Sequence, residues 1–89
     1  MDDPGKLQDP FGEYEGQFRE GVKEGFGIFH FKSRIRYEGY YKENVKNGRG
    51  SIINADGTIA FCGEFLNGLP HGKGYATDKK GIKHSLEWN

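Results

Sequence analysis

Aromatic and aliphatic residues alternate with charged ones along the stretch YEGQFREGVKEGFGIF, residues 14–29. Such alternation predicts β-strands, because successive side chains of a strand point to opposite faces of the sheet. The stretch also contains four glycines. Glycine inside a strand weakens it and usually marks a bulge or a close approach of another group to the backbone. The glycines therefore need a structural role of their own.

The same pattern returns twice along the chain. Residues 14–18 (YEGQF), 37–41 (YEGYY) and 61–65 (FCGEF) match one another, at spacings of 23 and 24 residues. A second glycine pair follows each of them: Gly25 and Gly27, Gly48 and Gly50, Gly72 and Gly74. Thirteen of the 15 glycines lie within the repeats, nine of them at these matched positions, so chance is a poor explanation. Fixed periods of this size indicate stacked supersecondary units.

This pattern resembles the MORN (membrane occupation and recognition nexus) repeat, whose signature is roughly Y-E-G-x-W/F-x-x-G-x-x-x-G-x-G. YEGQFREGVKEGFG fits it nearly position for position, and FCGEFLNGLPHGKG fits with Cys62 in place of the usual acid. YEGYYKENVKNGRG departs at Asn44, where the family has glycine. The resemblance covers residues 14–88. Repeat pattern and resemblance together predict an all-β fold, an elongated single-layer antiparallel sheet of stacked β-hairpins.

The repeats divide the chain into two parts. We expect a loosely ordered lead-in over residues 1–13, in which residues 9–12 form a turn that packs Phe11 against the first strand. The repeat array follows over residues 14–89, with repeats at 14–36, 37–60 and 61–83 and a partial fourth at 84–89.

Each repeat is predicted to form two short strands, with turn chemistry between them at residues 20–25, 43–48 and 67–72. Asp56-Gly57 predicts a two-residue hairpin turn between the second and third repeats. The other connections, residues 32–34 and 79–81, are predicted to have three residues, and this difference would account for the unequal repeat spacings.

Antiparallel pairing in this register places three rows of residues on one face, which we call the aromatic face. The outer row alternates rings with glycines: Phe18, Gly25, Tyr41, Gly48, Phe65, Gly72, Trp88. The middle row is mostly glycine: Gly16, Gly27, Gly39, Gly50, Gly63, Gly74, Leu86. The third row is mostly apolar: Tyr14, Phe29, Tyr37, Ile52, Phe61, Ala76, His84. A glycine opposite each ring would let the ring lie flat, which predicts a core one layer thick.

The opposite face, which we call the charged face, has its own central row: Gln17, Phe26, Tyr40, Arg49, Glu64, Lys73, Glu87. From Arg49 onward the charges alternate in sign, and opposite charges on neighbouring strands stabilise a sheet. Tyr40 beside Arg49 predicts a cation–π contact.

Composition excludes several classes of function. With 13 basic and 13 acidic residues the net charge is zero, which argues against nucleic-acid binding and weakens a purely electrostatic attachment to membranes. The single cysteine, Cys62, excludes an internal disulfide. No apolar run approaches about 20 residues, and the first residues are no signal peptide. We therefore expect a cytoplasmic protein or a cytoplasmic piece of a larger one, with cytoskeletal or membrane association as further options.

No catalytic or metal-binding arrangement stands out. His71 lies at a turn position where the family often has histidine, and Cys62 falls on the charged face beside Tyr75 and Ser51. No nucleophile has a histidine–acid pair at a known spacing. The glycine pairs lack the spacing of a phosphate-binding loop, and the acidic residues lack that of a calcium loop. We expect no enzyme activity, no metal and no cofactor.

Five lysines form a possible site for anionic lipid headgroups, which the family's name suggests: Lys23, Lys46, Lys79, Lys80 and Lys83. Lys23 and Lys46 occupy the same turn in successive repeats. The alternative is an ordinary solvated surface, because Glu20, Glu24 and Glu43 in the same turns cancel the field.

The aromatic face is either the core of a single-layer sheet or, in addition, a groove for a partner. We expect a non-catalytic protein–protein interaction or scaffold module that binds a helix or extended peptide in this groove. The expected contacts are Tyr14, Phe18, Phe29, Tyr37, Tyr41, Phe61, Phe65 and Trp88. The alternatives are a peripheral membrane module, or a targeting or regulatory segment of a larger lipid-kinase or methyltransferase protein. The exposed edge strands would also permit a homo-oligomer.

Overall fold

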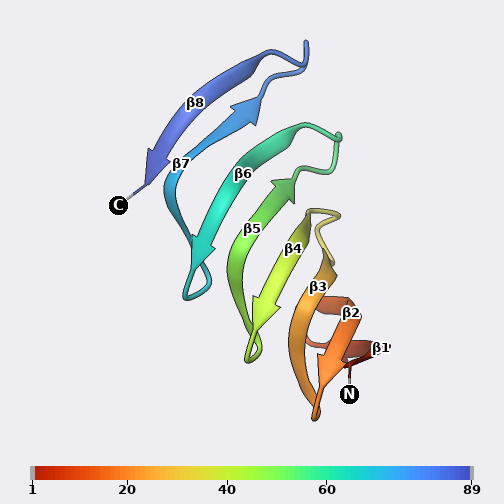
Figure 1. Cartoon of the computed structure of the whole chain (residues 1–89). Coiled ribbons are helices and arrows are strands. Elements are labelled where there is room, and N and C mark those ends of the chain that lie inside the picture. Colours follow the sequence, from red (N-terminus) through yellow and green to blue (C-terminus); the bar gives the residue numbers. More distant parts are fainter. Residues whose placement is uncertain (1, 89) are drawn as a thin grey trace.

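The computed structural model describes the backbone of residues 2–88 and the side chains of residues 5–88. Eight strands form a single antiparallel sheet in which each strand lies beside its neighbour in sequence, with β1 and β8 at the two edges (Figure 1). The strands are β1 (Asp2–Asp9), β2 (Gly12–Arg19), β3 (Val22–Phe31), β4 (Arg36–Lys42), β5 (Val45–Ile53), β6 (Ile59–Leu66), β7 (Leu69–Thr77) and β8 (Lys83–Trp88). The all-β, single-layer fold predicted from the repeats is confirmed.

A row of glycines crosses the sheet from one edge to the other, as predicted. Gly50 pairs with Gly39 on one side and with Gly63 on the other. The row is one strand longer than expected, because Gly5 of β1 pairs with Gly16. It runs through Gly5, Gly16, Gly27, Gly39, Gly50, Gly63 and Gly74 and ends at Leu86.

The rings that lie over this glycine row are Tyr14, Tyr37 and Phe61, each two residues before a glycine of its own strand. A Cβ placed on Gly27 would lie 2.3 Å from Cε1 of Tyr14, and one on Gly50 would lie 2.5 Å from Oη of Tyr37. The rings therefore rest directly on bare backbone. The sequence analysis was right about a glycine floor but wrong about its occupants, which it expected in the outer row.

The outer row differs because each hairpin of a repeat contains a bulge. Phe18 pairs with Lys23 instead of the predicted Gly25, and Tyr41 pairs with Lys46 instead of Gly48. The same shift places Pro70 opposite Phe65. The predicted pairs between hairpins are confirmed: Gly25 with Tyr41, Gly48 with Phe65, and Gly72 with Trp88.

Glycine is needed at the bulge itself. Gly25, Gly48 and Gly72 have φ values of +93°, +94° and +76°. These are left-handed conformations that a residue with a Cβ adopts at a cost. The glycines predicted to make room for rings therefore serve to turn the backbone within each hairpin.

The core is a continuous series of rings in edge-to-face contact. Tyr41 packs against Tyr14 at 5.1 Å and against Tyr37 at 5.3 Å between ring centroids. Phe65 continues the series, at 5.1 Å from Tyr37 and 5.4 Å from Phe61. Edge-to-face pairs contribute about 0.5–1.5 kcal/mol beyond their buried area. The series crosses β2, β4 and β6 and so joins the three repeats.

Buried hydroxyl groups in this core are satisfied by local backbone. Tyr14 Oη donates a hydrogen bond to the carbonyl oxygen of Gln17 at 2.7 Å, and Tyr37 Oη donates to that of Tyr40 at 2.8 Å. Burial raises the pKa of Tyr37 to about 12, and the backbone hydrogen bond opposes this shift.

The turns within the repeats are shorter than predicted. They consist of Glu20-Gly21, Glu43-Asn44 and Asn67-Gly68, and all six residues have positive φ, as in type I′ turns. Asn44, where the chain departs from the family glycine, has φ +72°, a conformation that asparagine tolerates. The departure therefore leaves the turn intact.

The connections between repeats lie within residues 32–35, 54–58 and 78–82, and each contains a loop of three residues closed by a backbone hydrogen bond. In each, a backbone N–H donates across the loop: Phe31 to Ile35, Asn54 to Thr58, and Asp78 to Ile82. The two-residue turn predicted at Asp56-Gly57 was wrong. Asp56 instead accepts hydrogen bonds from the backbone N–H and the hydroxyl of Thr58.

The longer spacing between the second and third repeats comes from a bulge at Ala60. Ile52 pairs with Phe61, whereas the next residue, Ile53, pairs with Ile59. The extra residue is therefore in the strand and not in the loop.

The lead-in over residues 1–13 was expected to be loosely ordered, whereas the structure has a strand there. β1 pairs with β2 along its full length, from Asp2 opposite Arg19 to Asp9 opposite Gly12. The predicted turn is present, because Asp9 Oδ1 accepts hydrogen bonds from the backbone N–H groups of Phe11 and Gly12. Phe11 does not pack against the first strand as expected, since its side chain at the tip of this turn is 73% exposed.

On the charged face, the predicted pairs between hairpins are again confirmed, and those within hairpins are shifted. Arg49 pairs with Glu64, with Nη1 and Oε2 3.4 Å apart. Glu64 lies opposite His71 and not Lys73. The cation–π contact predicted for Tyr40 and Arg49 does not occur; the ring of Tyr40 packs on Phe26 instead, at 5.6 Å between centroids.

The glycine floor predicts the cost of a branched side chain on it. Gly50→Val should destabilise the fold by more than about 1–3 kcal/mol, because its Cβ would collide with the Tyr37 ring. Arg49→Val, one residue away on the charged face, should stay within about 0.5 kcal/mol of the parent. Denaturant unfolding of both variants measures the difference. Equal stabilities would show that the ring does not depend on the bare backbone.

Tyr37→Phe tests the buried hydroxyl group. Near neutral pH, loss of its hydrogen bond should cost about 0.5–1.5 kcal/mol. The pKa of Tyr37 is about 10 in the unfolded chain and about 12 in the folded one, so the folded chain binds more protons between these values. Stability should therefore fall as pH rises through this window, and less steeply in Tyr37→Phe. The measurement is unfolding free energy against pH; parallel curves for parent and variant would contradict the prediction.

Candidate functional site

Most of the rings expected to line a partner groove are buried in the core. Tyr14 and Tyr37 are fully buried, and Phe29, Tyr41, Phe61 and Phe65 are at most 7% exposed. Phe18 is partly buried, and Trp88 is 47% exposed and contacts Phe61 edge to face. The structure therefore assigns six of the eight expected groove residues to the core of the sheet.

Two lysines lie on the aromatic face above these rings. The Nζ atom of Lys23 lies 5.3 Å from the ring centroid of Tyr14, 5.4 Å from that of Phe29 and 5.7 Å from that of Tyr41. The Nζ atom of Lys46 lies 5.3 Å from the ring centroid of Tyr37 and 5.8 Å from that of Phe31. Both lysines are partly buried. Their ammonium groups therefore lie over the core rings and are not fully exposed to solvent.

The bulges explain why these lysines face the rings. In the register expected from the glycines, Gly25 and Gly48 would have stood opposite the rings of Phe18 and Tyr41. The two-residue shift brings Lys23 and Lys46 to those positions instead.

Between the two lysines lies an open hollow of about 270 Å³, which we call the aromatic hollow. Its apolar walls are Phe11, Phe29, Phe31, Tyr41 and Val45, and Lys23, Asn44, Lys46 and Gly68 complete its lining. A concave, mostly apolar surface with a few polar groups is typical of a binding site.

The turns hold the two lysines in place through backbone contacts between repeats. Asn44 accepts a hydrogen bond from Lys23 N with its Oδ1 at 2.8 Å and donates one from its own N to Lys23 O at 3.0 Å. In the next repeat, Gly68 N donates to Lys46 O at 3.0 Å. Each turn therefore binds the strand of the preceding repeat just where a lysine stands.

The hollow carries positive charge that no neighbouring carboxylate balances. Burial, and then the positive charge of Lys23, lowers the pKa of Lys46. Among residues 5–88, no carboxylate lies within 4.0 Å of the ammonium group of Lys23 or Lys46. The hollow thus combines apolar walls with two positive charges that repel each other.

The other three lysines considered for lipid binding are elsewhere. Lys79 and Lys80 are exposed in the loop between β7 and β8, and Lys83 lies on the charged face, with its Nζ 4.6 Å from the ring centroid of Tyr75. The five lysines therefore do not form one surface.

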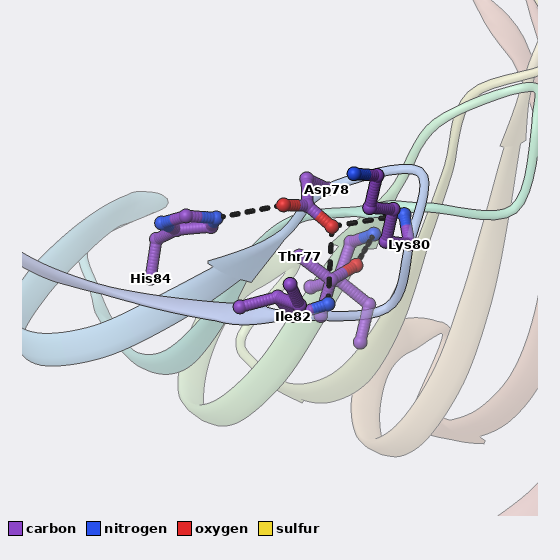
Figure 2. A network of polar contacts seen from close by, with 6 residues as sticks. Thr77, Asp78, Lys80, Ile82 and His84 are labelled. Atoms are coloured by element: carbon purple, nitrogen blue, oxygen red, sulfur yellow. Dashed lines mark hydrogen bonds and ion pairs between the residues drawn. The ribbon is translucent and has the colours of Figure 1, made fainter.

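Figure 2 shows that the loop between β7 and β8 is organised by Asp78. Its Oδ1 accepts hydrogen bonds from the backbone N–H groups of Lys80 and Ile82, and its Oδ2 lies 3.0 Å from Nε2 of His84. These contacts lower the pKa of Asp78, and the contact with His84 has the largest effect. The network gives this loop a fixed shape, which is a structural role.

Within the described part of the chain, no three histidine, cysteine, aspartate or glutamate side chains group together as metal ligands would. Cys62 is partly buried and pairs with Tyr75 and Ser51, as expected from the sequence. Between residues 2 and 88 the fold has no helix long and apolar enough to cross a membrane.

Sequence reasoning missed Phe11, Phe31 and Val45 as walls of the hollow. Phe31 could have been found, because it follows Phe29 by two residues and so shares its face. Phe11 was expected in a loosely ordered lead-in, packed against the first strand, and Val45 was placed in a turn.

Comparison with known proteins agrees with the repeat geometry. The family model described as the MORN repeat matches residues 14–35, 37–59 and 61–83. A search of curated proteins found no match. MORN repeats are a non-catalytic repeat type that generally serves as a protein- or membrane-interaction module. Because the three matches together cover well over half of the chain and follow the strands of one sheet, this chain belongs to the MORN repeat family.

Proposed function

We propose that this chain is a non-catalytic module that binds a segment of a partner protein on its aromatic face, at the aromatic hollow. The observation that carries the proposal is the hollow itself, with Phe11 73% exposed and Val45 40% exposed at its walls. Exposed apolar side chains around a concavity commonly mark an interaction surface.

The contacts we propose differ from those expected from the sequence. Tyr14, Tyr37 and Phe61 support the surface from below, because they are buried. Phe11, Phe31 and Val45 line the hollow and can be contacted by a partner. Since the ring series fixes this surface before binding, little side-chain entropy is lost when an apolar side chain of the partner enters.

A membrane surface is the less favoured partner. Lys23 and Lys46 lie on the aromatic face, whereas Lys83 lies on the charged face, so one flat bilayer cannot meet all of them. Membrane attachment through basic residues needs them gathered on one side. The hollow, in contrast, has the size and form suited to a side chain.

Several wider roles remain predictions from the sequence. They are a scaffold role, a cytoplasmic location, a regulatory role within a larger lipid-kinase or methyltransferase protein, and assembly through the edge strands β1 and β8.

Phe11→Ala tests the proposed surface. Peptides selected from a displayed library of short random sequences against the full chain serve as partners. Phe11→Ala should weaken their binding about 10-fold, the scale of one well-placed aromatic contact. The fold should persist, because Phe11 is mostly exposed. Affinity by fluorescence polarisation and the melting temperature are measured together.

Tyr40→Ala is the matched control, since Tyr40 is a half-exposed ring on the charged face. It should leave peptide affinity unchanged. If Tyr40→Ala weakens binding and Phe11→Ala does not, the partner surface is the charged face and the proposal is wrong. If no peptide is selected and the chain binds anionic vesicles, the membrane alternative takes its place.

A further inference from the structure

The fold itself does not require positive charge in the aromatic hollow. Lys23, Lys46 and Pro70 occupy the same position in the three repeats, opposite Phe18, Tyr41 and Phe65 respectively. All three are partly buried, and Lys23 and Lys46 lie over rings of the core. Because an uncharged proline completes the third repeat, the two lysines do more than cap the core.

Their charge is costly where it stands. Burial, and then the positive charge of Lys23, disfavours the charged form of Lys46. Contacts with ring faces offset part of this cost, since a cation is attracted to the face of an aromatic ring. The other lysines and arginines of the described chain are exposed or, as for Lys6, Arg36 and Arg49, have a carboxylate within 4.0 Å. Lys23 and Lys46 have none among residues 5–88.

Building on the proposed function, we propose that the aromatic hollow recognises an acidic side chain of the partner segment. Its carboxylate binds the ammonium groups of Lys23 and Lys46, and a neighbouring apolar side chain of the same segment enters the hollow beside Phe31 and Val45. The acid then selects the partner and the apolar side chain contributes buried area.

An acidic side chain fits this site better than a chain-terminal carboxylate. Terminal carboxylates are usually captured by a nest of backbone N–H groups. Here the N–H groups of Lys23 and Gly68 already bind Asn44 Oδ1 and Lys46 O. The donors that point over the rings are flexible ammonium groups.

A carboxylate also fits better than a phosphate group. A phosphate carries nearly two negative charges, and removing it from water at an apolar surface is more costly than removing a single charge. Glu20 and Glu43 lie in the adjoining turns and Glu24 in β3, and they would repel the larger charge more strongly.

The test compares a selected peptide that carries one glutamate beside an apolar residue with its twin that carries glutamine. The parent should bind the glutamate peptide at least about 10-fold more tightly, as a charge-assisted hydrogen bond would give. Lys23→Met/Lys46→Met retains the apolar stems over the rings and removes both charges. It should bind the two peptides equally, while Lys23→Arg/Lys46→Arg should keep the preference.

Lys83→Met is the matched control, because Lys83 also lies over a ring but on the charged face. It should keep the parent's preference for glutamate. Equal binding of both peptides by the parent would overturn the inference, and so would a preference that survives the double methionine substitution. If Phe11→Ala still weakens both peptides in that case, the proposed function stands and only the acidic preference is wrong.

A second measurement needs no variant. The pKa of Lys46, followed by NMR of its side chain, should rise when the glutamate peptide binds and stay unchanged with the glutamine twin. A constant value with both peptides would overturn the inference. Tighter lysine-dependent binding of a phosphoserine peptide, or of phosphatidylserine vesicles, would also overturn it and identify the other anion as the ligand.

Discussion

The contact of aromatic rings with bare backbone is the constraint on which this sheet depends. A sheet of one layer has no second layer to enclose its side chains, so its rings can be buried only by lying flat on the sheet itself. Tyr14, Tyr37 and Phe61 do this over the glycine row, where even a methyl group would come within 3 Å of the ring. Their flat orientation then presents faces and edges to Tyr41 and Phe65, which bridge from one repeat to the next.

The bulges are a second consequence of building a core from a single layer. Each hairpin must place an outer ring beside the flat one and still close through a two-residue turn. The left-handed glycines at 25, 48 and 72 absorb two additional residues and so bring a long side chain, or a proline, over the rings. The stems of Lys23 and Lys46 thereby supply part of the missing second layer. The surface that we propose for a partner therefore includes side chains that also cover the core.

The features of the fold that repeat along the chain could be predicted from the sequence. The glycine row, the strand order and the pairings between hairpins within the predicted rows followed from the spacing of identical residues, because the register across those rows is uninterrupted. Pairing within hairpins could not be predicted in this way, since Gly16 opposite Gly27 is compatible both with a regular ladder and with a bulge beyond it. Strand β1 was missed because it has only Gly5 of the repeat pattern. The hollow was missed because it depends on the two features that could not be predicted, the bulge and strand β1. The bulge turns Lys23 inward, and the β1–β2 turn supplies Phe11.

Repetition also allows one repeat to serve as the control for another. Phe61 takes the place of Tyr14 and Tyr37 without a hydroxyl group, so the ring is needed for the fold and the hydrogen bond is an addition to it. Pro70 takes the place of Lys23 and Lys46 without a charge, so the ammonium group is an addition that the fold does not require. The added hydroxyls are satisfied by the carbonyls of their own strands, whereas the added ammonium groups have no acid within the described chain. Local features that the fold neither needs nor satisfies are most often retained for function. The two lysines are therefore the part of this repeat array that we propose to contact a partner.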